Sequence, residues 1–455
     1  MEERLHRLVR LALAGCVLSL SGCAMLSPDG GFGRVGDMAK ERIEQKPQWV
    51  RTETEAKEAQ ATVKKLLAAP LTADVAVQIA LINNPGLQAT YADVGIAETD
   101  VVQAGRLRNP GFSYTRLRRA DELEIERTFM VDVLGLITMP LRTTLERRRF
   151  EMTRVRVAAQ VLRVAADTRR AYYRAVAAQE SVNYAQQVQE AAEASAELAR
   201  RMAAAGNFSR LDHAREQVFY AEATAQLARA RQTAVSERER LTQLMGLWSE
   251  DIRYALPARL PDLPKAARET GELEQTALKQ RLDVQSAMKE TESIASSLGL
   301  TRITGFISVL EVGYQRNSET NQPRQTGYEI ELRVPLFDWG GARVARAEYL
   351  YMQAVNRASE TAVRARSEVR EAYSGYRTAY DLARHYRDEV VPLRKRISDE
   401  NVLRYNGMLI SVFELLADAR QQIAAVNAYI EMLRDFWIAE SNLGLALTGT
   451  SLEKP

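Results

Sequence analysis

The chain has 455 residues, with 62 basic and 59 acidic side chains. This near balance of charge gives no indication of nucleic-acid binding. Apolar residues make up 46% of the sequence but aromatic residues only 7%. The abundance of Ala, Arg, Glu and Gln is typical of long exposed helices around a thin core.

The N-terminus has the pattern of a secretory signal peptide, which we assign to residues 1–22. Three arginines precede ten uncharged residues, Leu11 to Leu20, and small residues follow. As a helix, this apolar run would extend for about 15 Å, half of a hydrocarbon core of about 30 Å. It is therefore too short to be a membrane anchor.

The signal peptide ends in Leu20-Ser21-Gly22-Cys23, which resembles the lipobox of bacterial lipoproteins. The resemblance predicts cleavage before Cys23 and acylation of its sulfur; a chance cysteine beside a cleavage site is the alternative. Cys16 lies in the removed part, so the mature chain has one cysteine and no internal disulfide. Ala24 follows, rather than the acidic residue that retains such lipoproteins at the inner membrane, so we expect sorting to the outer membrane.

The mature chain begins with a polar segment, residues 23–70, which we interpret as a lipidated tether leading into a short helix after Glu53. No later segment is apolar enough to cross a bilayer as a helix. A membrane-spanning part would therefore have to be a β-barrel.

The sequence then repeats itself, which predicts a duplication. Gly206 and Gly407 share an offset of 201 residues with a second matching pair of segments, AYYRAVAA from Ala171 and AYSGYRTA from Ala372. A further pair matches at an offset of 197: ALINNPGLQ from Ala80 and ALKQRLDVQ from Ala277. The predicted parts are a first repeat at 71–255, a Pro-rich linker at 256–270, a second repeat at 271–449 and a tail at 450–455.

Each repeat has the same predicted order of elements: a lead-in helix of about 30 residues, two strands, and a very long helix that breaks at a glycine and returns. The run from Leu141 to Ala205 contains neither Gly nor Pro, and as a helix it would extend for about 98 Å. The corresponding run from Ala342 to Tyr405 contains Pro392, where we expect a kink. An antiparallel coiled coil is the alternative for these segments alone.

The strand-like runs alternate between apolar and polar residues. Tyr328, Ile330 and Leu332 alternate with Glu329 and Glu331, the run from Phe306 to Gln315 behaves similarly, and Phe112 to Thr115 and Phe129 to Val133 do so less cleanly. This alternation fits a membrane barrel, apolar toward lipid and polar toward a wet lumen, and equally a half-buried soluble hairpin. Bacterial barrels have at least eight strands, so four could close only by sharing among chains.

Four segments resemble the TolC-like outer-membrane efflux proteins, and the resemblance covers roughly residues 70–450. The segments are Leu71 to Tyr114, Val334 to Gly341, Tyr405 to Gln422 and Ser441 to Gly449. The resemblance implies a mainly α fold with a membrane β part: a homotrimer in which a long antiparallel α-helical tunnel continues a shared 12-stranded β-barrel, with four β-strands from each chain.

The implied function is that of an outer-membrane exit duct of a tripartite efflux system, lipid-anchored and with a large periplasmic portion. Its implied partners are a periplasmic adaptor, an inner-membrane pump of the resistance-nodulation-division type, and outer-membrane lipid. Two alternatives stay open: a duct for type I protein secretion, and a periplasmic coiled-coil lipoprotein scaffold.

The resemblance also gives the helix breaks a role. It places the periplasmic tips, where the adaptor binds, at Gly206, Asn207, Asn406 and Gly407, and glycine suits a turn that needs a positive φ. It places the periplasmic gate at Asp212, Phe413, Glu414 and Asp418. Acidic side chains around a narrow pore repel one another and attract cations, but Phe413 stands where some relatives have an acid. Ordinary solvated helix residues are the alternative for the three acids.

The stretch ELRVPLFDWGGARVARAE, from Glu331 to Glu348, combines a strand, two glycines and a helix, an arrangement that can bind phosphate. No Lys, Ser or Thr follows the glycines, so we interpret the stretch as a corner between strand and helix. The residues assigned to the two corners are Pro140, Pro335, Gly340 and Gly341.

No catalytic constellation stands out, and the sequence predicts neither an enzyme nor a cofactor. The mature chain has two histidines, His213 and His385, without the paired spacing of a metal site. His213, beside Asp212, is the one worth testing for metal contact. Nothing in the sequence indicates the cargo.

Overall fold

The computed structural model describes residues 26–269, 271–304, 309–333 and 337–452. The predicted signal peptide, Cys23 and Pro335 lie outside these residues. Contacts divide the chain into two compact units. Unit 1 comprises Met1–Gly33, Asp93–Arg154 and Met288–Arg357, and unit 2 comprises Arg34–Ala92, Val155–Ala287 and Ala358–Pro455.

The N-terminal segment is packed, whereas the sequence predicted a tether. In unit 1, Ser27 donates from Oγ to Glu98 over 2.5 Å, and Arg154 donates from Nε to the carbonyl of Gly31 over 2.9 Å. In unit 2, α3 (Glu53–Leu67) begins where predicted, behind a capping box of Thr52 and Glu55. The sequence analysis missed α2 (Gly33–Ile43), because its apolar residues are few.

Each lead-in helix is two helices. The first consists of α4 (Ala73–Asn83) and α5 (Pro85–Ala104), and the second of α8 (Leu273–Gln280) and α9 (Leu282–Thr304). Asn84 has ψ 116°, because the following proline disfavours the helical conformation. Arg281 has ψ 128° without a proline. Its fully buried guanidinium donates to Asp283 over 2.6 Å and to Glu368 over 2.8 Å, which fixes the break.

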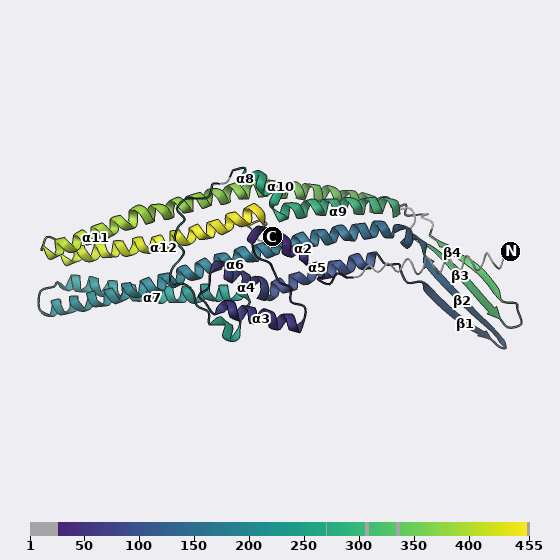
Figure 1. Ribbon diagram of the computed structural model, residues 1–455, viewed down its shortest axis with the longest axis horizontal. Helices are drawn as coiled ribbons and strands as arrows, with labels where there is room; N and C mark the ends of the chain where they lie inside the picture. Colours follow the sequence, from purple (N-terminus) through teal and green to yellow (C-terminus); the bar gives the residue numbers. More distant parts are fainter. Residues whose placement is uncertain (1–25, 270, 305–308, 334–336, 453–455) are drawn as a thin grey trace. The chain divides into compact units, whose positions relative to one another are not determined.

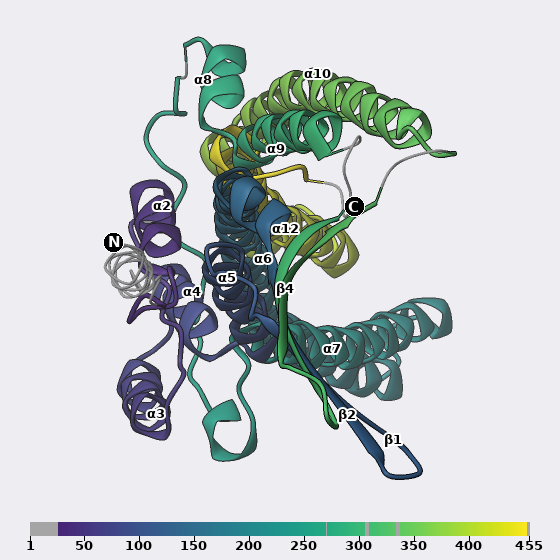
Figure 2. The same ribbon diagram turned by 90° about the vertical axis from the view of Figure 1, so that its right-hand side faces the viewer.

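Unit 1 contains one antiparallel sheet with the order β1-β2-β3-β4, and it is curved (Figure 2). The strands are β1 (Gly111–Arg119), β2 (Glu122–Asp132), β3 (Leu310–Glu319) and β4 (Gln325–Leu332). Their pairing runs without a bulge. The prediction of four strands, two from each repeat, is confirmed; the expected start of the third at residues 306–308 lies outside the described residues.

The long helices form two hairpins whose turns lie at the same end of unit 2 (Figure 1). The first hairpin is α6 (Val133–Ala204) with α7 (Arg210–Met245), followed by the short 3₁₀ turn η1 (Ser249–Ile252). The second runs from α10 (Gly341–His385) through a π-helical turn, η2 (Tyr386–Val390), into α11 (Val391–Asn406), and returns as α12 (Val412–Thr448). Pro392 follows the π turn and has no N–H to donate, which accounts for the local change from α-helical to π-helical hydrogen bonds.

Among the described residues, no helix combines the length and the apolar character needed to cross a lipid bilayer.

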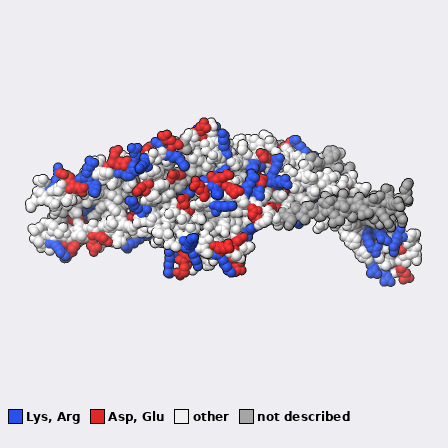
Figure 3. All heavy atoms as spheres, viewed as in Figure 1, with Lys and Arg blue, Asp and Glu red and all other residues white. Residues whose placement is uncertain are grey.

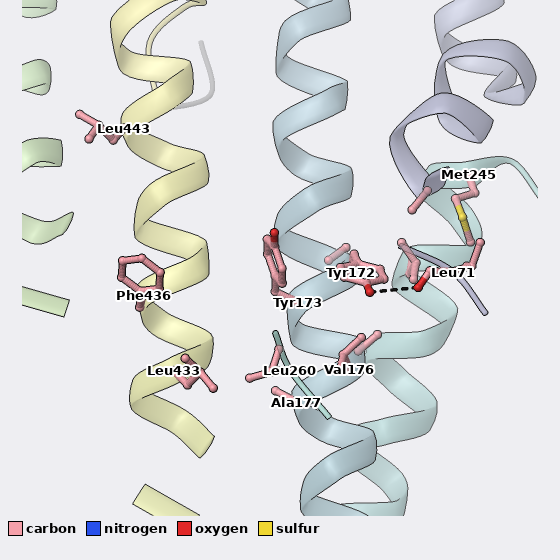
Figure 4. Packing of buried hydrophobic residues seen from close by; sticks show 14 of the residues in the cluster. Leu71, Tyr172, Tyr173, Val176, Ala177, Met245, Leu260, Leu433, Phe436 and Leu443 are labelled. Atoms are coloured by element: carbon pink, nitrogen blue, oxygen red, sulfur yellow. Dashed lines mark hydrogen bonds between the residues drawn. The ribbon is translucent and has the colours of Figure 1, made fainter. Parts of the chain in front are cut away.

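Both repeats contribute to the core of unit 2. Tyr172 donates from its hydroxyl to the carbonyl of Leu71 over 3.0 Å (Figure 4). Tyr173 stacks on Trp437 with ring centroids 5.3 Å apart. Small residues such as Ala171 and Ala446 fill the contacts between the helices, so the backbones approach closely. The Pro-rich linker joins this core through Leu260 and Leu263.

Candidate membrane face and helical turns

One face of the sheet is apolar and exposed. The strand register pairs Phe112 with Phe129, Phe129 with Tyr314 and Tyr314 with Tyr328, so each strand gives one aromatic ring to a single row. Tyr328 is 86% exposed and Ile330 69%. We call this side the apolar face. Its apolar members are Phe112 and Tyr114 in β1, Leu123, Ile125, Phe129 and Val131 in β2, Leu310, Val312 and Tyr314 in β3, and Tyr328, Ile330 and Leu332 in β4.

The other face of the sheet, which we call the polar face, holds every acidic side chain of the strands. They are Glu122, Glu124, Glu126, Asp132, Glu311, Glu319, Glu329 and Glu331. A half-buried soluble hairpin would cover its apolar side and expose its polar side. Here the exposed apolar row favours the membrane alternative.

The first corner between strand and helix corrects a prediction. β2 ends at Asp132 and α6 begins at Val133, so Pro140 lies inside α6 and does not mark the corner. Asp132 accepts a hydrogen bond from the N–H of Gly135 over 2.6 Å and so caps the helix. A Cβ on Gly135 would lie 2.3 Å from Asp132 Oδ2, which explains the glycine there.

At the second corner, Gly340 has φ 78° and Gly341 is the first residue of α10. The N–H of Gly340 donates to Asp338 Oδ1 over 2.9 Å. Positive φ at Gly340 is a conformation that a side chain disfavours. The glycine pair therefore lies where the chain enters the helix.

The turn between α6 and α7 closes with the hydrogen bonds of a Schellman motif. Gly206 has φ 77°, its N–H donates to the carbonyl of Ala203 over 3.1 Å, and the N–H of Asn207 donates to that of Met202 over 3.0 Å. Ser209 then caps α7, accepting from the N–H of Asp212 over 3.1 Å.

The turn between α11 and α12 has the same hydrogen bonds, displaced by one residue from the predicted match. Met408 has φ 60°, and its N–H donates to the carbonyl of Tyr405 over 2.9 Å. The N–H of Leu409 donates to the carbonyl of Arg404 over 2.8 Å. Gly206 therefore corresponds to Met408, at an offset of 202.

The expectation of a positive φ at Gly407 is wrong: its φ is −81°, and it caps the end of α11 directly after Asn406. The left-handed residue is the next one along the chain, Met408. Glycine is favoured at such a position but not required there.

Two of the predicted gate acids are helix-capping residues. Glu414 follows Ser411 as Asp212 follows Ser209, and in both pairs the carboxylate bonds back to the serine. Ser209 donates from Oγ to Asp212 over 2.5 Å, and the backbone N–H of Ser411 donates to Glu414 over 3.1 Å. The side chain of Phe413 lies outside the described residues.

The sequence analysis missed a buried acid near the turns, Glu216. It is 2% exposed and accepts hydrogen bonds from Ser195 Oγ over 2.9 Å and from Arg420 over 3.2 Å. The Arg420 guanidinium also lies 4.1 Å from the ring centre of Phe219. These contacts connect the two hairpins. The offset of 202 pairs Glu216 with Asp418, and this shared acid seven residues after each serine cap is the signal that could have revealed it.

Asp418 and His213 differ from Glu216. Asp418 Oδ2 and His213 Nε2 are shielded from solvent, and neither has a hydrogen-bond partner within the described ranges. In those same ranges, no group of three or more His, Cys, Asp or Glu side chains is arranged to hold a metal ion.

Comparison with known proteins places these features on a known fold. No protein-family model matches the chain. The solved structure of CusC matches 86% of this chain and 92% of its own, at 16% identity and a TM-score of 0.69. The open state of the MtrE outer membrane channel of Neisseria gonorrhoeae matches 85% of this chain and 89% of its own, also at 16% identity and a TM-score of 0.69. The chain has the fold of the outer-membrane channels.

The predicted fold class and the resemblance to TolC-like outer-membrane efflux proteins are thereby confirmed at the level of the fold. Among curated sequences, the chain is 26% identical over 276 residues to the cobalt-zinc-cadmium resistance protein CzcC of Cupriavidus metallidurans. The match covers 60% of this chain and 64% of CzcC, less than two thirds of that relative.

Proposed function

We propose that this protein is the outer-membrane exit duct of a tripartite efflux system, conducting its cargo passively. The observation that carries the proposal is the sheet, whose exposed apolar face opposes a face bearing all the acidic side chains of the strands. A chain with the fold of outer-membrane channels and such a sheet is suited to line an aqueous path through lipid.

The strand lengths and the open edges of the sheet support a shared barrel. The strands have 8 to 11 residues, close to the 9 to 11 or so that a tilted membrane strand needs. β1 and β4 each pair on one side only, and unpaired strand edges are costly in lipid. A homotrimer would pair each β1 with a β4 of the next chain and close twelve strands.

The helical turns are the proposed contact for a periplasmic adaptor, and the second turn offers more apolar surface than the first. Met408 is 92% exposed and Leu409 77%, whereas Gly206 and Asn207 present mainly backbone and amide. Asp212, Phe413, Glu414 and Asp418 remain the proposed gate. An inner-membrane pump of the resistance-nodulation-division type would supply the energy.

The proposed cargo is divalent metal cations, supported by two observations. The curated relative is named a cobalt-zinc-cadmium resistance protein. In the proposed barrel, each of the three chains would contribute the eight acids of its polar face to the lining of the lumen. Such a lining concentrates cations. Lipidation at Cys23 and location in the outer membrane are part of the same proposal.

The test of the duct is fractionation followed by conductance in planar bilayers. We expect detergent extraction from the outer membrane, a trimer, and discrete cation-selective pores. Extraction without detergent together with silent bilayers would favour the coiled-coil lipoprotein scaffold and end the proposal.

A pair of neighbouring substitutions tests the orientation of the sheet. Ile330→Lys places a charge on the apolar face, and we expect it to prevent assembly into the outer membrane, because a Lys deep in the lipid costs about 2–4 kcal/mol. Glu329→Lys, on the polar face, is the matched control and should assemble and conduct with reduced cation selectivity. Normal assembly of Ile330→Lys would contradict the assignment of the faces.

The adaptor contact is tested by Met408→Gln with Leu409→Gln, which removes the apolar surface of the second turn. We expect loss of metal efflux in cells while trimer and pores persist. Val235→Gln, at an exposed position of α7 away from the turns, is the control. Undiminished efflux in the double variant would exclude this contact, and export of peptides rather than metals would favour the duct for type I secretion.

A further inference from the structure

The apolar face carries arginines beyond its aromatic row. Arg127 and Arg316 are direct partners across β2 and β3, in the row that also contains Tyr114 and Thr326. This row is the next one from the aromatic rings on the same face, toward the turns of the two β-hairpins. Arg116 and Arg118 continue the series along β1 on the same face.

Within the part of the chain that the structure describes, these arginines have no acidic partner. The strands place no Asp or Glu on the apolar face, and Arg116, Arg127 and Arg316 make no ion pair with any described residue. Arg127 lies over the ring of Tyr114, with 5.8 Å from the guanidinium carbon to the ring centre. Like charges directly opposite on neighbouring strands destabilise a sheet, so the pair of Arg127 and Arg316 calls for an external anion.

The position of the pair limits what that anion is. From Leu310 to Arg316 the strand advances by six residues, about 20 Å at 3.4 Å per residue, and the aromatic row comes two residues before the arginine. Aromatic rings gather where a membrane meets water. On the side of the sheet visible in Figure 3, basic side chains gather toward the hairpin turns. The pair thus lies just beyond an apolar band, at the depth of lipid headgroups.

We propose that Arg127 and Arg316 bind the phosphate groups of an acylated, phosphorylated glycolipid of the outer leaflet, whose acyl chains cover the apolar face. The inference rests on the proposed function, in which the helices are periplasmic and the hairpin turns face outward. A guanidinium presents two parallel N–H groups that match a phosphate. Phosphate groups bound at Arg127 and Arg316 would also neutralise the repulsion between the two guanidinium groups.

The experiment measures lipid binding to the full-length, detergent-purified trimer by native mass spectrometry. The probes are lipid A with two phosphates, the same glycolipid without phosphates, and phosphatidylglycerol. We expect the wild type to prefer the phosphorylated glycolipid, and R127Q/R316Q to bind it about tenfold more weakly, since hydrogen bonds to charged groups are lost. Arg119→Gln, on the polar face near the same hairpin turn, is the matched control and should bind as the wild type does.

Equal binding of the dephosphorylated glycolipid, or unchanged binding by R127Q/R316Q, would overturn the proposal. Equal binding of phosphatidylglycerol would overturn the choice of an outer-leaflet glycolipid. If the double variant fails to assemble, R316Q alone and Arg316→Lys replace it; Lys keeps the charge but loses the paired N–H geometry, so intermediate binding is expected. Planar-bilayer conductance of the same samples separates the two proposals: pores without lipid preference reject only the lipid site, whereas absence of pores in the wild type rejects the duct.

Discussion

The two helical turns of unit 2 have the same backbone conformation and hydrogen bonds but are built from different residues. Both close a helix with the paired hydrogen bonds of a Schellman motif and open the next with a serine cap. The left-handed residue is Gly206 in one turn and Met408 in the other. Hydrogen bonding and capping, more than the presence of glycine, therefore define where the chain reverses.

The difference between the turns extends to the acids behind them. Glu216 is bonded to Ser195 and Arg420, whereas its counterpart Asp418 keeps one carboxylate oxygen shielded and unpaired within the described chain. Near the first turn the acid thus connects the two hairpins by hydrogen bonds, whereas the acid near the second turn has a buried oxygen without such a bond among the described residues. Each of the following changes tests one side of this comparison.

Removal of the buried acid should have the largest effect. Glu216→Ala leaves Arg420 and Ser195 without their acceptor, and we expect a loss of about 2–3 kcal/mol in the free energy of unfolding, the cost of hydrogen bonds to a charged group. Asp418→Ala, which removes no hydrogen bond seen in the structure, should change stability by less than about 0.5 kcal/mol. Thermal unfolding in detergent compares the two, and equal losses would show that the two acids are equivalent after all.

Substitutions at the left-handed residues should change the free energy of unfolding in opposite directions in the two turns. Gly206→Val places a β-branched residue at φ 77°, and a Cβ there meets nothing within 4 Å, so the expected loss of about 1–2 kcal/mol reports backbone strain alone. Met408→Gly should instead gain up to about 1 kcal/mol by relieving the same strain. The midpoint of chemical unfolding measures both.

Gly407 provides the control for this pair. Because its φ is −81° and an added Cβ would make only ordinary contacts at 3.5 Å, Gly407→Ala should be neutral. A clear loss of stability in this variant, or a loss in Met408→Gly, would contradict the assignment of Met408 as the counterpart of Gly206.

The sequence could predict the parts of this fold that depend on the periodicity of apolar residues and on residues that interrupt helices. Alternation placed the four strands, and long helical runs that break at a glycine placed the two helical hairpins. It failed where the outcome depends on tertiary contacts: Arg281 breaks a helix without proline because its side chain is buried against two acids. Pro140 lies inside α6, seven residues after the helix begins, although it has no N–H to donate there. At the turns, matching glycines gave an offset of 201, because a glycine is visible in a sequence and a hydrogen-bond pattern is not.

The serine caps should contribute equally in the two turns. Ser209 and Ser411 accept from the N–H of the third helical residue over 3.1 and 3.3 Å, and replacing such a cap by Ala costs about 1 kcal/mol. We therefore expect Ser209→Ala and Ser411→Ala to lower the free energy of unfolding by similar amounts. Hydrogen exchange of the first turns of α7 and α12 would locate the effect, and protection lost in only one helix would break the equivalence.

The smallest expected effect comes from an ion pair that is stronger in the first hairpin than in the second. Hydrogen bonds from Arg200 and Arg201 lower the pKa of Glu197 to about 2, whereas Glu400 in the second hairpin has a single contact with Arg404 at 3.4 Å.

A lowered pKa means that the folded state favours the charged carboxylate. Its stabilisation is present above the ordinary pKa of 4.5 and is lost as the pH falls toward 2. The group is exposed, so the effect is small and decreases further with salt. The difference in melting temperature between the wild type and Glu197→Gln should therefore shrink from pH 6 to pH 2.5, while Glu400→Gln shows little difference throughout. A difference for Glu197→Gln that persists unchanged at pH 2.5 would mean that the glutamine alters packing rather than charge.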